Sequence, residues 1–166
     1  MNTNILIIED ETAIQSILSE LLTDAGYNIE VASDGLEGIT KFRKKPFSLV
    51  LLDIMMPKID GYTVCEMIRQ ESNVPIIMLT ALDEEEAQVK AFELQVDDYI
   101  TKPFSPFILE ARIENILSVR KKLWESYKNS GNISAYKSLL PENSAKQQFV
   151  ARVTDIIEAY IGDPSF

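Results

Sequence analysis

Acidic, hydroxyl and basic side chains stand at the ends of short apolar runs in this sequence. Glu9 and Asp10 follow one run and Asp53 ends another, while Thr80 and Lys102 stand at the ends of two more. Carboxylates held close together repel one another, and a neighbouring cation relieves that repulsion. Because carboxylate oxygens completed by water are typical ligands of Mg²⁺, these acids predict a Mg²⁺ site.

Lys102 and Thr80 extend this chemistry towards phosphoryl transfer. A metal ion, an ammonium and a hydroxyl donor together stabilise the charge on the equatorial oxygens of a transferred phosphoryl group. Asp53 is then the candidate nucleophile, which would be converted to an acyl phosphate. Taken singly, such residues are more often turn formers, helix caps or loop residues. Their occurrence at successive strand ends is what favours a shared site.

The apolar runs predict the sheet that would position these side chains. Residues 5–8, 49–53 and 74–79 are nearly continuous apolar segments, typical of strands buried on both faces of a parallel sheet. Residues 28–32 and 97–101 are short segments of more polar character, and 28–32 is expected near an edge. Alternation with helices specifies an α/β fold with a doubly wound, five-stranded parallel sheet, in which ligands bind at the carboxyl ends of the strands.

Five amphipathic helices are predicted to alternate with the strands. Gly26 is expected to end the first helix as a C-terminal cap, and the fifth is expected to end near Arg120. The expected helix starts are Thr12, Asp34, Asp60, Asp83 and Ser105.

The sequence predicts three segments: a domain over residues 1–121, a polar linker over 122–144 and an amphipathic helix over 145–166. The last helix has an apolar stripe and no partner after it in the sequence, which predicts the start of a truncated further domain.

Composition excludes several other functions. A net charge of -10, from 16 basic and 26 acidic residues, argues against nucleic-acid binding by this segment itself. One cysteine and no histidine exclude a disulfide framework and any general base that needs imidazole. Cys65 falls in an apolar pattern and is expected to be a buried hydrophobic residue. Neither a membrane span nor a signal peptide is apparent, so we expect a cytoplasmic protein without a membrane partner.

The residues at the strand ends lie in stretches that resemble the receiver domain of two-component response regulators. The stretches, in chain order, are Ile-Leu-Ile-Ile-Glu-Asp-Glu, Leu-Val-Leu-Leu-Asp-Ile-Met-Met-Pro-Lys-Ile-Asp-Gly, Pro-Ile-Ile-Met-Leu-Thr-Ala and Asp-Asp-Tyr-Ile-Thr-Lys-Pro-Phe. The resemblance runs from Ile5 to about Arg120 and implies a flavodoxin-like strand order, 2-1-3-4-5.

The resemblance implies that Asp53 accepts a phosphoryl group from a phosphohistidine on a sensor histidine kinase. Asp10, Asp53 and the carbonyl of Met55 would bind Mg²⁺ directly, with Glu9 helping through water. The absence of histidine in this chain agrees with a donor on another protein. Such a receiver is not an enzyme in the usual sense, since it only gains and loses its own phosphoryl group.

The resemblance also implies a switch. Thr80, Lys102 and the backbone N–H of Ala81 would hold the phosphoryl oxygens. Thr80 would swing towards the phosphoryl group, and Tyr99 would turn inward into the space that it leaves. This movement would change the face made by the fourth helix, the fifth strand and the fifth helix, and would control an output domain that regulates transcription.

The sequence departs from one family pattern on that face. Relatives that dimerise there often pair a basic residue of the fourth helix with an acid of the fifth. Lys90 is present in this sequence, but Ile108 stands where the acid is expected. Arg112 and Asp98 can still pair. A homodimer of another geometry therefore stays open, and the Lys102–Pro103 bond is expected to be cis by family analogy.

The C-terminal segment resembles the first helix of AraC-type DNA-binding domains as they follow receivers. DNA would then be bound only through an output domain missing from this chain. The alternative is a helix that docks on the receiver or pairs with a second copy. For the whole chain, two rival functions remain: a magnesium-dependent phosphatase of the haloacid dehalogenase type, which needs a second acid where Met55 stands, and a pseudo-receiver that only binds a partner.

Overall fold

The computed structural model describes residues 3–81 and 93–130. The chain divides into two compact units, residues 1–114 and 115–166. The first unit contains the sheet and all of the residues that were predicted to do chemistry.

Five parallel strands form one sheet in the order β2-β1-β3-β4-β5, which confirms the expected doubly wound fold. Every residue of β3 and β4 is buried, as continuous apolar runs predict for central strands, and the more polar β2 lies at an edge. The strands are β1 (Asn4–Ile8), β2 (Asn28–Ala32), β3 (Leu49–Asp53), β4 (Ile76–Thr80) and β5 (Asp98–Thr101).

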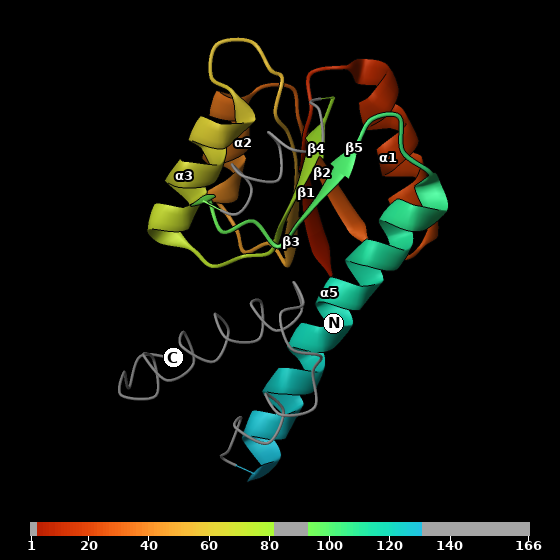
Figure 1. Cartoon of the computed structure of the whole chain (residues 1–166), viewed down its shortest axis with the longest axis vertical. Helices are drawn as coiled ribbons and strands as arrows, with labels where there is room; N and C mark the ends of the chain where they lie inside the picture. The colour runs from red at the N-terminus through yellow and green to blue at the C-terminus, as the bar shows by residue number, and fades with distance from the viewer. Residues whose placement is uncertain (1–2, 82–92, 131–166) are drawn as a thin grey trace. The chain divides into compact units, whose positions relative to one another are not determined.

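Helices cover both faces of this sheet (Figure 1). Helices α2 and α3 pack against each other on one face, and α1 lies on the other face with the start of α5. The helices of the described residues are α1 (Thr12–Asp24), α2 (Gly35–Phe42), α3 (Gly61–Glu71) and α5 (Pro106–Ser130). Of the helix predicted from Asp83 to about Leu94, all but the last two residues lie outside the described part of the chain.

The helix starts and stops follow from local sequence chemistry. The carboxylate of Asp34 accepts a hydrogen bond from Glu37 N, and that of Asp60 accepts one from Thr63 N, both at 2.8 Å. Gly26 takes the left-handed conformation, with φ at 89°, directly after the end of α1, as expected for a C-terminal cap. Each of these three residues therefore has the role predicted for it.

The predicted burial of Cys65 is confirmed, since its side chain is fully buried in the core between the sheet and α3. The core has no room for solvent to reach this thiol, so its part in the fold is that of a small apolar residue.

Helix α5 is longer than the sequence predicted. It was expected to end near Arg120 but continues to Ser130, into the segment predicted as a linker. Residues 121–130 contain neither glycine nor proline, and Gly131 is the first helix breaker, so nothing in the local sequence stops the helix earlier. The predicted helix over 145–166 lies outside the described residues, and the domain boundaries stay a prediction.

Candidate functional site

The strand register brings the predicted residues to one edge of the sheet. Glu9 directly follows β1, Asp53 is the last residue of β3, Thr80 is the last residue of β4, and Lys102 directly follows β5. In the pairing of β3 with β4, Asp53 lies opposite Leu79, the residue before Thr80. Because all five strands are parallel, their carboxyl ends meet at this edge.

Lys102 connects two buried carboxylates at this edge. Its Nζ lies 2.8 Å from Oε2 of Glu9 and 3.1 Å from Oδ1 of Asp53. Glu9 is 0% exposed and Asp53 is 2% exposed. Oδ1 of Asp53 has only the ion-pair contact with Lys102, because within the described part of the chain no donor is oriented to form a hydrogen bond with it. A buried carboxylate oxygen that is short of donors is a place where a further cation would be stabilised.

Three carboxylates form a cluster with the spacing of a metal site. Glu9, Asp10 and Asp53 each place one oxygen within 4.8 Å of the others. Asp10 is half-buried, which leaves an approach from solvent. Hard oxygen donors of this kind, completed by water, fit Mg²⁺.

Burial and mutual repulsion perturb the ionisation of this cluster. The pKa of Glu9 is raised, first because burial disfavours its charge and also because the carboxylate of Asp53 lies nearby. The hydrogen bond from Lys102 opposes this rise without cancelling it. For Lys102, burial acts to lower the pKa, but the hydrogen bond to Glu9 and the charge of Asp53 raise it above its usual value. The site is therefore a lysine ion held among acids, one of which readily takes up a proton.

The other predicted site residues lie at or near the same edge. Thr80 is fully buried, and its carbonyl accepts a hydrogen bond from Lys102 N at 2.6 Å. Met55 and Ala81 lie in the loops that follow β3 and β4, and the side chain of Met55 is 62% exposed. Tyr99 lies within β5, half-buried against the core.

Two expected features beside β5 are confirmed. Arg112 of α5 contacts Asp98, with 2.5 Å between Nη1 and Oδ1. The peptide bond between Lys102 and Pro103 is cis.

Gly61 supports the site in a way that the sequence interpretation missed. Its N–H donates to the carbonyl of Ile54 at 2.9 Å, and a Cβ at this position would stand 2.1 Å from the carbonyl oxygen of Asp53. Only glycine allows the first turn of α3 to approach the end of β3 this closely. The signal was present as the Asp-Gly pair that starts α3 after Asp53, but it was interpreted only as a helix start.

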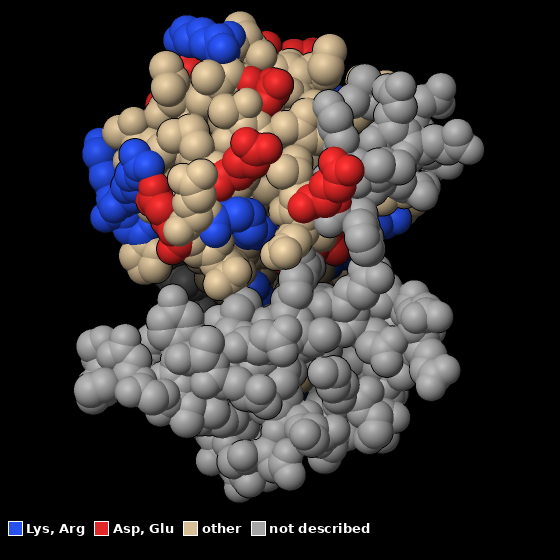
Figure 2. All heavy atoms as spheres, turned by 60° about the vertical axis from the view of Figure 1, so that its left-hand side comes forward, with Lys and Arg blue, Asp and Glu red and all other residues tan. Residues whose placement is uncertain are grey.

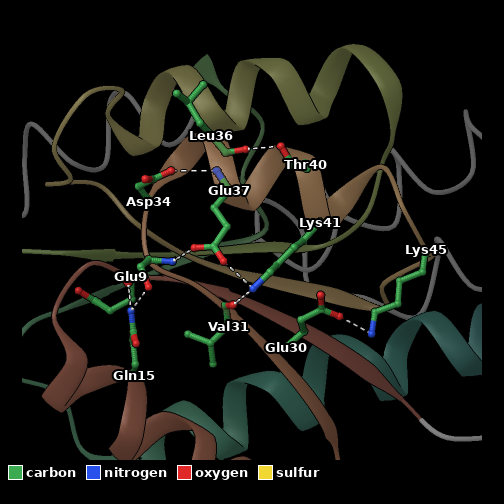
Figure 3. Close-up of polar contacts among 11 residues, drawn as sticks. Glu9, Gln15, Glu30, Val31, Asp34, Leu36, Glu37, Thr40, Lys41 and Lys45 are labelled. Atoms are coloured by element: carbon green, nitrogen blue, oxygen red, sulfur yellow. Dashed lines mark hydrogen bonds and ion pairs between the residues drawn. The ribbon is translucent and has the colours of Figure 1, made fainter.

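Gln15 is a second residue that was missed. Its side-chain amide, from the first turns of α1, donates to the carbonyl of Glu9 at 2.5 Å (Figure 3). A polar residue at a half-exposed helix position gives no sign of such a contact in the sequence.

Three basic residues near the end of α2 form ion pairs with acidic residues. Figure 2 shows lysine and arginine side chains beside acidic ones on one face of the described residues. The pairs at this end of α2 are Lys41 with Glu37, Arg43 with Glu71, and Lys45 with Glu30.

Fold and site together define a receiver-type domain, and comparison with known proteins gives the same class. The family model described as "Response regulator receiver domain" matches residues 5–114. The chain therefore belongs to the response regulator receiver family. This membership does not favour the haloacid dehalogenase phosphatase or the pseudo-receiver.

Individual relatives of the chain include proteins that are described as transcriptional regulators. It is 51% identical over 132 residues to a protein described as "Probable transcriptional regulator ycf27" from Pyropia yezoensis, covering 78% of this chain and 54% of that protein. The CheY-like receiver of Methanospirillum hungatei has a TM-score of 0.70 and 31% identity, with 74% of this chain and 98% of that one covered. DrrB of Thermotoga maritima, an OmpR/PhoB homologue, has a TM-score of 0.66 and 34% identity, with coverage of 71% and 54%. The chain spans about half the length of the curated relatives it matches.

Among the helices of the described residues, none combines the length and apolar character that crossing a membrane requires.

Proposed function

We propose that this receiver is switched by phosphorylation of Asp53, with a phosphohistidine of a sensor histidine kinase as the donor. A carboxylate oxygen of Asp53 attacks phosphorus, the P–N bond breaks, and the histidine ring leaves with the electron pair and takes up a proton. The product is an acyl phosphate on Asp53. The observation that carries this proposal is the buried Asp53 carboxylate at the end of β3, 3.1 Å from the ammonium of Lys102.

The acidic cluster is proposed to hold Mg²⁺ during this step. Asp10, Asp53 and the carbonyl of Met55 would bind the ion directly, and Glu9 would act through water. The spacing of the three carboxylates and the shortage of donors to Oδ1 of Asp53 support this assignment. When bound, the ion would neutralise charge on the phosphoryl oxygens.

Other residues at the edge are proposed to bind the phosphoryl group or to move in response to it. Lys102, the hydroxyl of Thr80 and the backbone N–H of Ala81 would hold the phosphoryl oxygens. Thr80 would move towards the phosphoryl group, and Tyr99 would turn inward. Tyr99 is half-buried on β5, so a turn of its side chain would change the surface there when Asp53 is phosphorylated.

The response would then pass to a further domain. We infer a cytoplasmic transcription regulator that binds DNA through an output domain beyond this chain. The names of the relatives and their greater length support this inference. A homodimer is a further possible partner state. The chain itself would perform no reaction besides gaining and losing its phosphoryl group.

Acetyl phosphate with Mg²⁺ tests the proposal directly. Mass spectrometry of the whole chain is expected to show one added phosphoryl group in the wild type and none in Asp53→Ala. Asp24→Asn, which changes an exposed acid at the end of α1, is the matched control and is expected to react like the wild type.

Failure to form the adduct in the wild type would support the pseudo-receiver. Continuous hydrolysis of a phosphomonoester that Asp53→Ala abolishes would support the phosphatase. Either result would overturn the proposed function.

A further inference from the structure

The loop that carries Glu9 and Asp10 lacks a cap at the start of α1. The N-cap position is Glu11, and its side chain makes no capping hydrogen bond, in contrast to Asp34 and Asp60 before α2 and α3. Residues 9–11 are therefore fixed by other contacts. Any freedom in this loop would move two of the three clustered carboxylates together.

Gln15 supplies a side-chain contact to this loop. Its Nε2 donates to the carbonyl oxygen of Glu9 at 2.5 Å (Figure 3). The same Nε2 donates to Oγ of Ser33, in the turn between β2 and α2, at 3.3 Å. Its own backbone N–H donates to the carbonyl of Glu11 at 2.9 Å. One amide group thus connects the helix, the acidic loop and a neighbouring turn.

The turn on the far side of this contact is itself well anchored. Ser33 N donates to Oε2 of Glu37 at 2.7 Å, and Oε1 of Glu37 lies 2.7 Å from Nζ of Lys41. Lys41 also donates to the carbonyl of Val31 in β2 at 2.5 Å. Through its contact with Ser33, Gln15 is itself held in place while it binds the carbonyl of Glu9.

We propose that Gln15 is a positioning residue for the cation site, acting through the backbone of Glu9. By fixing this carbonyl it sets the direction in which the peptide enters Asp10, and so holds the carboxylates of Glu9 and Asp10 in a geometry that suits a divalent ion. This inference rests on the proposed function, because it assumes that the cluster binds Mg²⁺. Groups that orient metal ligands typically change metal affinity about 10–100-fold when they are removed.

The test is a titration of the whole chain with MgCl₂, followed by the backbone amide NMR signals of residues 9–11 and 53. Gln15→Met keeps the length of the side chain but removes both N–H donors, and Gln15→Leu is a second variant of the same kind. Both are expected to bind Mg²⁺ about tenfold more weakly than the wild type. Ser33→Ala, which removes the longer of the two contacts, is expected to have a smaller effect in the same direction.

Ser16→Ala is the matched control. Its hydroxyl donates to Thr12 O within α1, so its loss is expected to leave Mg²⁺ affinity unchanged. The melting temperature of each variant is measured in EDTA, because a purely structural role for Gln15 would lower it without changing the affinity of the folded protein.

The two proposals fail in different ways. If the wild type binds Mg²⁺ and Gln15→Met and Gln15→Leu bind it equally well, the positioning role is excluded while the proposed function stands. If the wild type does not bind Mg²⁺, the proposed function fails and the inference fails with it.

Discussion

The ammonium of Lys102 donates a hydrogen bond of 2.8 Å to Oε2 of Glu9, a residue 93 positions earlier in the chain. The ammonium therefore lies between the carboxylates of Glu9 and Asp53. A metal ion bound to these carboxylates would neutralise the same negative charge. We expect a lysine held here to balance the charge of the two buried acids and to compete with a divalent ion for them.

Replacing Lys102 by methionine separates its expected effect on Mg²⁺ binding from its expected effect on phosphorylation. We expect Lys102→Met to bind Mg²⁺ more tightly, on the order of tenfold, because a competing positive charge is removed from beside the carboxylates. Phosphorylation by acetyl phosphate is expected to become slower, because the charge that stabilises the phosphoryl oxygens is lost. A Mg²⁺ titration and a time course of adduct formation measure the two effects.

Lys45→Met provides the control, since it also removes an ammonium, but one that pairs with Glu30. It should change neither quantity. Weaker Mg²⁺ binding by Lys102→Met would show that the lysine supports the metal site instead of competing for it.

The raised pKa of Glu9 makes the stability of the metal-free protein depend on pH. Because the folded state holds this proton more tightly than the unfolded state, the stabilisation is complete below the ordinary pKa of 4.5. It is lost as pH rises through the raised pKa. Denaturation by urea in EDTA is therefore expected to give a free energy of unfolding that falls as pH increases from about 4.5 towards neutrality.

Glu9→Gln is expected to remove this dependence and to stabilise the metal-free protein at neutral pH, since no buried charge has to form. Mg²⁺ affinity of the wild type should rise over the same pH range, because the ion requires the deprotonated acid. A stability that is flat with pH in the wild type, or unchanged in slope in Glu9→Gln, would contradict the assignment to Glu9.

Sequence patterns predicted the fold because most of the strands, and the capped ends of the helices, have a local chemical cause. The run from Leu49 to Asp53 is apolar enough for a central strand, and Asp34, Asp60 and Gly26 take up their capping roles through their own short-range contacts. The acids and Lys102 stand at the carboxyl ends of the predicted strands. Because parallel strands run in the same direction, these residues could be predicted to lie at one edge of the sheet.

Other features could not be predicted, because they depend on packing between distant segments. Gly61 is distinctive only because the carbonyl of Asp53 lies against it, and Gln15 only because the carbonyl of Glu9 lies within its reach. The length of α5 was misjudged for a different reason. The polar character of residues 121–130 was interpreted as linker, although these residues favour a helix.

Gly61→Ala is expected to damage both stability and function. The added Cβ would stand 2.1 Å from the carbonyl oxygen of Asp53 and 2.8 Å from Cα of Ile54, and backbone atoms cannot move aside as a flexible side chain can. We expect a loss of about 2–3 kcal/mol in the free energy of unfolding, which is typical of overpacking against a rigid neighbour. Phosphorylation of the folded fraction should also slow, because the end of β3 is displaced.

Gly26→Ala is the matched comparison. Gly26 needs its positive φ, but a Cβ added to it would have no neighbouring atom within 4 Å, so alanine there is expected to cost about 1 kcal/mol without affecting phosphorylation. Equal effects of the two substitutions on phosphorylation would exclude a specific role for the contact between Gly61 and Asp53.

Breaking the ion pair between Arg69 and Asp97 is expected to destabilise the fold strongly, because it would leave a buried carboxylate without its cation. Asp97 has a side chain that is only 4% exposed, and its Oδ2 lies 3.0 Å from Nη2 of Arg69 and 2.9 Å from the N–H of Ile76, at the start of β4. Arg69→Met leaves this carboxylate buried without its cation, which typically costs about 3–5 kcal/mol. The double variant Arg69→Met/Asp97→Asn is expected to recover part of the loss, because the uncompensated charge is gone.

Urea denaturation measures the free energy of unfolding of the single and the double variant, and Arg43→Met is the control. The pair of Arg43 with Glu71 is exposed, so its loss should matter far less. If Arg69→Met were no more destabilising than Arg43→Met, the buried pair would not be what holds α3 to the segment before β5.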